Sequence, residues 1–236
     1  MFETLRVTGS TNADLAARLS AGEPVPEGFW LLADRQNAGR GRLGRVWDDG
    51  LGNFMGSTAV ALGPYDPQAG SLALVAGLAV QGNVAPLVPP PHVPLLKWPN
   101  DVMVGGAKLA GILLERVGDH VIVGIGVNLA SAPQIEGRET CALSRFGPAP
   151  DRDAFAASLA QNFAAELVRW RSFGMEALLA RWQSAAHPQG TPLSVSQSDG
   201  SKVSGIFSGL DATGALRLAL ADGTCQTIHA GDVSLR

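Results

Sequence analysis

The 236-residue sequence is poor in lysine, in cysteine and in long hydrophobic runs. Only three of its eighteen basic residues are lysines, Lys97, Lys108 and Lys202, and the other fifteen are arginines. The net charge of −3 excludes a surface that binds nucleic acid through overall positive charge, so we predict no DNA partner. Cationic chemistry must therefore be local, and the position of each lysine is informative.

The two cysteines, Cys141 and Cys225, lack the spacing of a metal site. Reduced thiols are the expected state, with a single disulfide as the alternative. The N-terminus has no basic stretch followed by an apolar segment, which a signal peptide requires. No run of about 18 apolar residues is present, so we predict no membrane span. These absences predict a cytoplasmic protein with no membrane partner.

The composition is 46% hydrophobic and 17% charged, which indicates a globular chain with a sizeable core. Patterning predicts a mixture of helices and strands in the first four-fifths of the sequence. The expected elements are a helix at 10–20, strands at 29–36 and 53–62, a buried helix at 69–84, a loop at 86–94, a hairpin turning at Gly105-Gly106, a strand at 120–130, and two helices within 151–186 with Asp151 as the first cap.

The pattern changes after His187. Short alternating stretches follow, with turn signals at Asp199-Gly200, Thr213-Gly214 and Asp222-Gly223. Such spacing is typical of a small all-β barrel. We therefore predict two domains, residues 1–187 and 188–236.

The segment AGRGRLGRVW, residues 38–47, concentrates glycine and arginine. Glycines let backbone N–H groups turn toward an anion, and arginines add charge-assisted hydrogen bonds. A Walker loop is excluded because no G-x-x-x-x-G-K-[ST] is present. The dinucleotide pattern G-x-G-x-x-G fits Gly39, Gly41 and Gly44, but no helix is predicted to follow. The alternative to an anion-binding loop is a solvated basic turn.

Three further segments carry residues of chemical interest. KWPND, residues 97–101, reads either as a functional turn or simply as the entry to a hairpin. In the following strand, alternation places Lys108 on one face with Ala110, Ile112 and Leu114, where it must reach solvent or a partner. GIGVN, residues 124–128, places glycines in a buried strand, which suggests close approach by a ligand.

Taken together and in this order, AGRGRLGRVW, KWPNDV, KLAGILLE and GIGVNL resemble the biotin protein ligases, as does the early STN at residues 10–12. The resemblance implies an α+β fold. Its catalytic domain is a mixed β-sheet flanked by helices, like that of class II synthetases, and a small SH3-like β-barrel follows. Because STN occurs so early, the monofunctional type without a DNA-binding domain is expected.

The resemblance implies a two-step reaction. Biotin and ATP with Mg²⁺ give biotinyl-5′-adenylate and pyrophosphate, and biotin then passes to one lysine of an acceptor. The expected acceptor is the biotin carboxyl carrier protein of acetyl-CoA carboxylase or of another biotin-dependent carboxylase. The glycine–arginine loop is expected to be a mobile lid whose arginine charges are uncompensated until substrate anions arrive. The chain is expected to be a monomer or a homodimer.

The resemblance also implies roles for individual residues. Lys108 and Arg42 are the expected catalytic residues, and Lys108 bridges the biotin carboxylate and the α-phosphate. Asp101 orients the acceptor lysine or a metal-bound water, and no metal ligand is assigned. The expected biotin site comprises Ser10, Thr11, Asn12, Gln36, Gly39, Arg40, Gly111, Gly124 and Gly126. The expected ATP site comprises Arg42, Arg45, Trp47, Lys108 and Asn128.

One departure from the family lies after Trp47, where Asp48-Asp49-Gly50 replaces the more usual Ser-Pro. Two other functions remain as alternatives. A lipoate or octanoate ligase would share the fold but carries an RRxSGGG-like run, which is absent here. A non-catalytic biotin-binding regulator would have no need for the phosphate-binding residues Lys108, Arg42 and Arg45.

Overall fold

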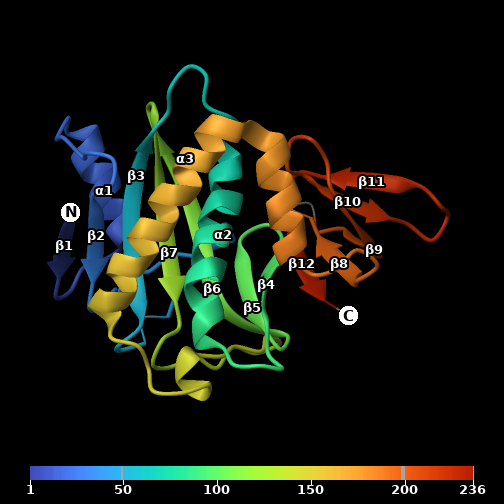
Figure 1. Ribbon diagram of the computed structural model, residues 1–236, viewed down its shortest axis with the longest axis horizontal. Coiled ribbons are helices and arrows are strands. Elements are labelled where there is room, and N and C mark those ends of the chain that lie inside the picture. The colour runs from blue at the N-terminus through green and yellow to red at the C-terminus, as the bar shows by residue number, and fades with distance from the viewer. Residues whose placement is uncertain (49, 198–199, 236) are drawn as a thin grey trace.

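The computed structural model describes residues 1–48, 50–197 and 200–235, which form two β-sheets and three α-helices (Figure 1). The predicted turn at Asp199-Gly200 and the departure at Asp49 fall at least partly outside the described residues. The first sheet has seven strands in the order β1-β2-β3-β7-β6-β5-β4. Their bounds are β1 Phe2–Leu5, β2 Trp30–Ala33, β3 Phe54–Ala61, β4 Pro94–Lys97, β5 Asp101–Val104, β6 Ala107–Val117 and β7 His120–Val127.

Both faces of this mixed sheet are covered. Helix α1, Thr11–Ser20, packs on one face, where Leu15 meets Leu31 and Ile122. Helices α2, Leu72–Val84, and α3, Arg152–Ala185, cover the opposite face, as Figure 1 shows. The α+β architecture expected from the sequence is confirmed. Strand alternation sends neighbouring residues to opposite cores, so the sheet residues are apolar on both sides.

The predicted helices are present with small shifts. The Asp151 carboxylate accepts the Ala154 N–H at 2.9 Å, which confirms the predicted cap. Gly174 has a non-helical backbone with φ +68° and divides α3 into two helical segments, as expected. The helical stretch Ala69–Leu87 is long and apolar enough for a membrane span by length and composition. Because most of this stretch is buried inside the protein, it is a core helix here.

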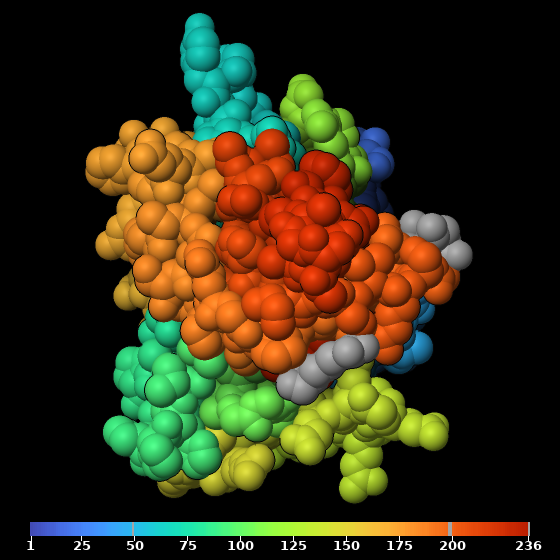
Figure 2. Space-filling model, turned by 90° about the vertical axis from the view of Figure 1, so that its right-hand side faces the viewer, coloured from blue at the N-terminus to red at the C-terminus, as the bar shows by residue number. Residues whose placement is uncertain are grey.

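The second sheet is antiparallel and has the strand order β11-β10-β9-β8-β12. Its bounds are β8 Pro192–Ser196, β9 Lys202–Leu210, β10 Leu216–Ala219, β11 Cys225–Ile228 and β12 Asp232–Leu235. Figure 2 shows these C-terminal residues, in orange and red, covering one side of the molecule. Leu193 and Leu216 belong to the same hydrophobic cluster as Leu96 and Trp182, so the two sheets share a packed junction.

The predicted face of Lys108 is wrong. The pairing of β5 with β6 shifts register between Val102 and Met103, because Val102 pairs with Ala110 but Met103 pairs with Lys108. This bulge reverses the alternation, so the Lys108 ammonium lies beside Gly111, on the face opposite Ile112. The lysine therefore leaves the apolar core face and joins the face that carries α1.

The cap of α3 generates a stability prediction. Asp151→Ala is expected to lower the free energy of unfolding by about 1 kcal/mol, because the Ala154 N–H loses its acceptor. Asp151→Asn is the control, since asparagine caps about as well as aspartate. Urea unfolding of the three proteins measures the difference. An equal loss in both variants would show that charge matters here and that capping does not.

Candidate functional site

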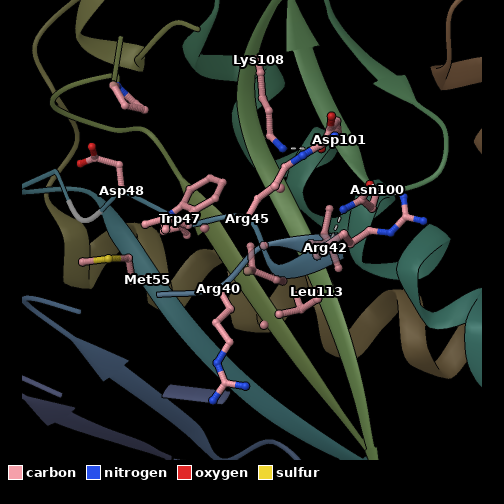
Figure 3. Close-up of a pocket in the computed structure, with 18 of the residues that line it drawn as sticks. Arg40, Arg42, Arg45, Trp47, Asp48, Met55, Asn100, Asp101, Lys108 and Leu113 are labelled. Carbon is pink, nitrogen blue, oxygen red and sulfur yellow. Dashed lines mark hydrogen bonds and ion pairs between the residues drawn. The ribbon is translucent and has the colours of Figure 1, made fainter. Parts of the chain in front are cut away.

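A cavity of about 600 Å³ opens on the α1 face of the seven-stranded sheet. Its walls come from the start of α1, the loop at 36–48, strands β3, β5, β6 and β7, the segment 133–140, and Asp232 at the start of β12. Figure 3 shows the loop arginines and Trp47 above this part of the sheet. The site thus collects residues from both ends of the sequence.

The cavity brings together nearly all the residues singled out from the sequence. Those lining it are Ser10, Thr11, Asn12, Gln36, Arg40, Arg42, Arg45, Trp47, Asp101, Lys108, Gly111, Gly124, Gly126 and Asn128. Gly39 does not line the cavity; its backbone carbonyl accepts the Trp47 N–H at 2.9 Å and so holds the loop. Several polar lining residues were not assigned to the site from the sequence, and Ser57, Asn100, Arg138 and Asp232 are among them.

A chain of buried neutral polar groups forms one end of the cavity. The Gln36 Oε1 accepts both the backbone N–H of Thr11, at 2.7 Å, and its hydroxyl, at 3.0 Å. The Thr11 and Ser57 hydroxyls lie 2.7 Å apart, and Ser57 donates to the Asn12 Oδ1 at 2.6 Å. Asn12 in turn donates to the side chain of Glu115, which is partly buried and does not line the cavity, at 2.7 Å. Mutual hydrogen bonding fixes these side chains, so their orientation is set by the fold.

Glycines form the floor between the two ends. Gly126 pairs with Met55 on one side and with Gly111 on the other, and Gly111 pairs with Asp101. The Trp47 ring lies over both glycines, and a Cβ at Gly126 would overlap it. A Cβ at Gly124 would likewise overlap the Asn12 amide. Because Gly124 and Gly126 have no side chains, the Asn12 amide and the Trp47 ring can lie directly against the sheet.

Apart from the Asp101 Oδ1, which forms an ion pair with Lys108, two buried polar atoms among the described residues of this cavity have no hydrogen-bond partner. One is the Trp47 Nε1, a donor, and the other is the Asn128 Oδ1, an acceptor. The Asn128 amide nitrogen is engaged, because it donates to the Cys141 carbonyl at 3.0 Å. An unpaired buried polar atom costs free energy, so both atoms favour a ligand with complementary polar groups.

The glycine–arginine loop is folded as a small hairpin over the cavity. The Gly41 N–H donates to the Arg45 carbonyl at 2.7 Å, and the Trp47 N–H donates to the Gly39 carbonyl. Leu43, at the tip, has a positive φ of 58° and is exposed. A leucine in this conformation is strained, which is a feature of functional loops. The expected mobility of the loop stays a prediction.

Asp101 lies between two lysines at the other end of the cavity. Its carboxylate is 2.6 Å from the Lys108 ammonium and 3.3 Å from the Lys97 ammonium. Burial alone would raise the pKa of Asp101, but the charges of Lys108 and Lys97 outweigh it and lower the pKa. The buried carboxylate is thus ionised at neutral pH and holds Lys108 in the cavity, 5.7 Å from the centre of the Trp47 ring.

The loop arginines differ in their partners. Arg42 donates to two neutral oxygens, Asn100 Oδ1 and the Gly231 carbonyl, both at 3.3 Å, and burial lowers its pKa. Arg45 donates to the Asp232 carboxylate at 2.7 Å, so the expectation that the charges of the loop arginines are uncompensated is wrong for Arg45. Figure 3 shows Arg42 and Arg45 pointing toward Asn100 and Asp101, whereas Arg40 points away from them.

The cavity carboxylates do not form a metal cage. Within residues 1–48, 50–197 and 200–235, no three His, Cys, Asp or Glu side chains cluster as metal ligands. Asp101 and Asp232 are each bound to two cationic side chains. These two carboxylates are therefore engaged with cationic side chains of the chain itself.

Comparisons with known proteins find similar chains and family models. A model described as the biotin/lipoate A/B protein ligase family matches residues 5–128, and one described as the biotin protein ligase C terminal domain matches residues 195–236. The chain is 39% identical to the biotin–[acetyl-CoA-carboxylase] ligase of Mycobacterium tuberculosis, over 98% of this chain and 88% of that protein. It is 37% identical to the ligase of the same name from Paracoccus denitrificans, over 96% and 97%.

A solved structure is similar along its whole length. The biotin protein ligase from Aquifex aeolicus in complex with biotin and ATP superimposes with a TM-score of 0.85. The match covers 100% of this chain and 98% of that one, at 27% sequence identity.

The Asp232 ion pairs generate a prediction about pH. Burial raises the pKa of Asp232, but the hydrogen bonds and charges of Arg45 and Arg138 outweigh it and lower the pKa to about 2. The stability that Asp232 contributes is therefore complete above its unfolded pKa of 3.8 and is lost as the pH falls toward 2. Asp232→Asn should be less stable than the parent protein at pH 7, with a difference that narrows below pH 4. The midpoints of unfolding of the two proteins, measured from neutral to acid pH, test this prediction. A difference in stability that does not change with pH would contradict it.

Proposed function

This chain belongs to the biotin protein ligase family, and we propose that the single cavity described above carries out both half-reactions of a biotin–[acetyl-CoA-carboxylase] ligase. One observation carries the proposal: Lys108, held by Asp101 at 2.6 Å, lies in the same cavity as a neutral polar end and a set of arginines. A carboxylic acid with a neutral polar head and a nucleotide polyphosphate can therefore meet at one ammonium group.

The polar end suits the head group of biotin. Its cyclic urea offers one carbonyl acceptor and two N–H donors, which need neutral polar partners. Ser10, Thr11 and Gln36 are the proposed partners, with Asn12 in the same hydrogen-bonded chain. Gly39 and Arg40, in the loop above, are the proposed contacts near the biotin carboxylate.

The first half-reaction joins biotin to AMP. A biotin carboxylate oxygen attacks the α-phosphorus of ATP, a new C(O)O–P bond forms, and the bond to the β-phosphate oxygen breaks, releasing pyrophosphate. Lys108 lies where it can neutralise charge on both the carboxylate and the α-phosphate, and Arg42 adds a second positive charge. Because Arg42 rests on two neutral oxygens, its charge is not balanced by a hydrogen-bonded carboxylate there.

The adenine is proposed to lie beside Trp47 and Asn128. Asn128 Oδ1 lacks a partner, and the exocyclic amino group of adenine is a donor that could satisfy it. The Trp47 ring supplies an aromatic surface for stacking. Arg45 completes the proposed ATP site as a phosphate ligand.

In the second half-reaction the ε-amine of the acceptor lysine attacks the carbonyl carbon of the adenylate. An amide bond forms, the bond from the carbonyl carbon to the phosphate oxygen breaks, AMP leaves, and one proton of the amine is released to solvent. Asp101 is the proposed group that orients this amine, because it is an ionised carboxylate that already binds two ammonium groups. The proposed acceptor is the biotin carboxyl carrier protein of acetyl-CoA carboxylase or of another biotin-dependent carboxylase.

Magnesium is proposed to enter bound to ATP, where it would neutralise phosphate charge. The cytoplasmic location and the choice between monomer and homodimer stay predictions.

The alternative activity, ligation of lipoate or octanoate, differs from biotin ligation in the carboxylic acid that is used. Pyrophosphate release from ATP is expected with biotin and not with octanoate, and release with octanoate alone would overturn the proposal.

Lys108 provides the sharpest test of the adenylation step. Lys108→Ala should reduce biotin-dependent pyrophosphate release by about a hundredfold or more, because positive charge is lost where negative charge develops. Lys202→Ala, at an exposed position on the C-terminal sheet, is the matched control and should retain activity. Thermal melting checks that both variants fold. Normal turnover by folded Lys108→Ala would remove the lysine from the mechanism.

The glycine floor provides a second test. Gly124→Ala places a methyl group against the Asn12 amide and is expected to raise the KM for biotin about tenfold or more, because it displaces that amide from the polar chain. Gly82→Ala, in helix α2, meets nothing within 4 Å and should leave the KM unchanged. Equal KM values in the two variants would show that Asn12 does not shape the biotin site.

A further inference from the structure

The start of strand β12 binds cations from three separate parts of the chain. The Gly231 carbonyl accepts from Arg42 of the loop, and the Val233 carbonyl accepts from Lys97 at the end of β4, at 2.9 Å. Between them, Asp232 Oδ2 accepts from Arg45 at 2.7 Å and from Arg138 at 2.6 Å. The C-terminal sheet therefore supplies one wall of the charged end of the cavity.

Arg138 belongs to a segment that plays no part in the function described so far. The turn at 135–138 closes with a hydrogen bond from the Arg138 N–H to the Ile135 carbonyl at 3.1 Å. The residues that follow pair with β6 beside Lys108, because Lys108 donates its N–H to the Glu139 carbonyl at 2.8 Å. Arg138 is thus one residue removed from the backbone partner of Lys108, and its side chain lines the same cavity.

Two guanidinium groups on one carboxylate oxygen make an unusual arrangement. The two cations repel each other, and Asp232 balances only one of their charges. Each guanidinium carries five N–H donors in a planar fork, of which the bond to Asp232 uses one. Two oriented forks with a net positive charge match the oxygens of a polyphosphate.

The placement of the pair indicates which phosphates it contacts. Lys108 and Arg42 are the proposed contacts at the reacting α-phosphate. Arg45 is more exposed than Arg42 and reaches the C-terminal sheet at the rim of the cavity. A triphosphate that runs outward from Lys108 would meet this rim with its β- and γ-phosphates.

We propose that Arg138 and Arg45 form a phosphate clamp, positioned by Asp232, that binds the β- and γ-phosphates of ATP and the pyrophosphate that leaves. This inference rests on the proposed function and adds Arg138 as a substrate-binding residue and Asp232 as a positioning residue. It predicts a clear separation between the two substrates, because biotin binds at the opposite end of the cavity.

The test compares KM values for the two substrates of the adenylation step. Arg138→Ala should raise the KM for ATP and the inhibition constant of inorganic pyrophosphate about tenfold or more, with the KM for biotin within twofold. Arg138→Lys keeps the positive charge but loses the planar guanidinium. Its KM for ATP and its inhibition constant for pyrophosphate should lie between those of the parent protein and of Arg138→Ala. Arg116→Ala removes an exposed arginine that is bound to the Gly118 carbonyl, and should change none of these values.

Asp232 is tested by the same measurements. Asp232→Asn should raise the KM for ATP by loosening both arginines, and Asp232→Glu, which restores a carboxylate, should recover part of the loss. If Arg138→Ala leaves the KM for ATP and the pyrophosphate constant unchanged, the clamp is wrong. A parallel rise in the KM for both substrates with a lower melting temperature would also overturn it, since that is the result of a structural role alone.

Calorimetric binding of inorganic pyrophosphate separates this inference from the proposed function. If the parent protein binds pyrophosphate more tightly than Arg138→Ala does, the clamp is supported. This holds even if neither biotin nor octanoate drives pyrophosphate release, a result that would overturn only the proposed function. Equal binding by the two proteins overturns the clamp whatever the activity of the parent protein.

Discussion

The ionised carboxylate of Asp101, buried between Lys108 and Lys97, is the interaction on which the site depends. Without it two nearly buried ammonium groups would lie side by side, at a cost of several kcal/mol. With it, Lys108 is fixed in the cavity and Lys97 is free to donate to the Val233 carbonyl. One carboxylate therefore positions the proposed catalytic lysine and ties the C-terminal sheet to the first sheet.

The cavity separates two kinds of chemistry along the sheet. Neutral side chains around Thr11 and Ser57 satisfy one another at one end, and cations anchored by Asp101 and Asp232 occupy the other. A floor of glycines joins the ends because Gly111 and Gly126 pair across neighbouring strands. This separation lets a neutral ring system and a polyphosphate bind without competing for the same donors, while their reacting groups meet near Lys108.

Much of the site could be predicted from the sequence because its motifs are local. The segments around residues 10, 40, 100, 110 and 125 each carry several site residues close together in the sequence, and all five segments line the cavity. Two expectations failed for non-local reasons. The bulge at Lys108 depends on how β6 pairs with β5, and the partner of Arg45 lies 187 residues away. Ser57 escaped notice because a small hydroxyl in an apolar strand carries no signal of its own.

The sequence by itself determined most of the helices and strands, the cap at Asp151, the division of 151–186 into two helices and the motifs that indicate a biotin ligase. These depend on neighbouring residues, whose propensities and spacing are visible in the chain. Only the tertiary structure decided which face Lys108 occupies, which carboxylates bind the cations, and that β12 closes the charged end of the cavity. Such pairings join residues that are distant in sequence, and their energies depend on burial and separation, which arise only when the chain has folded.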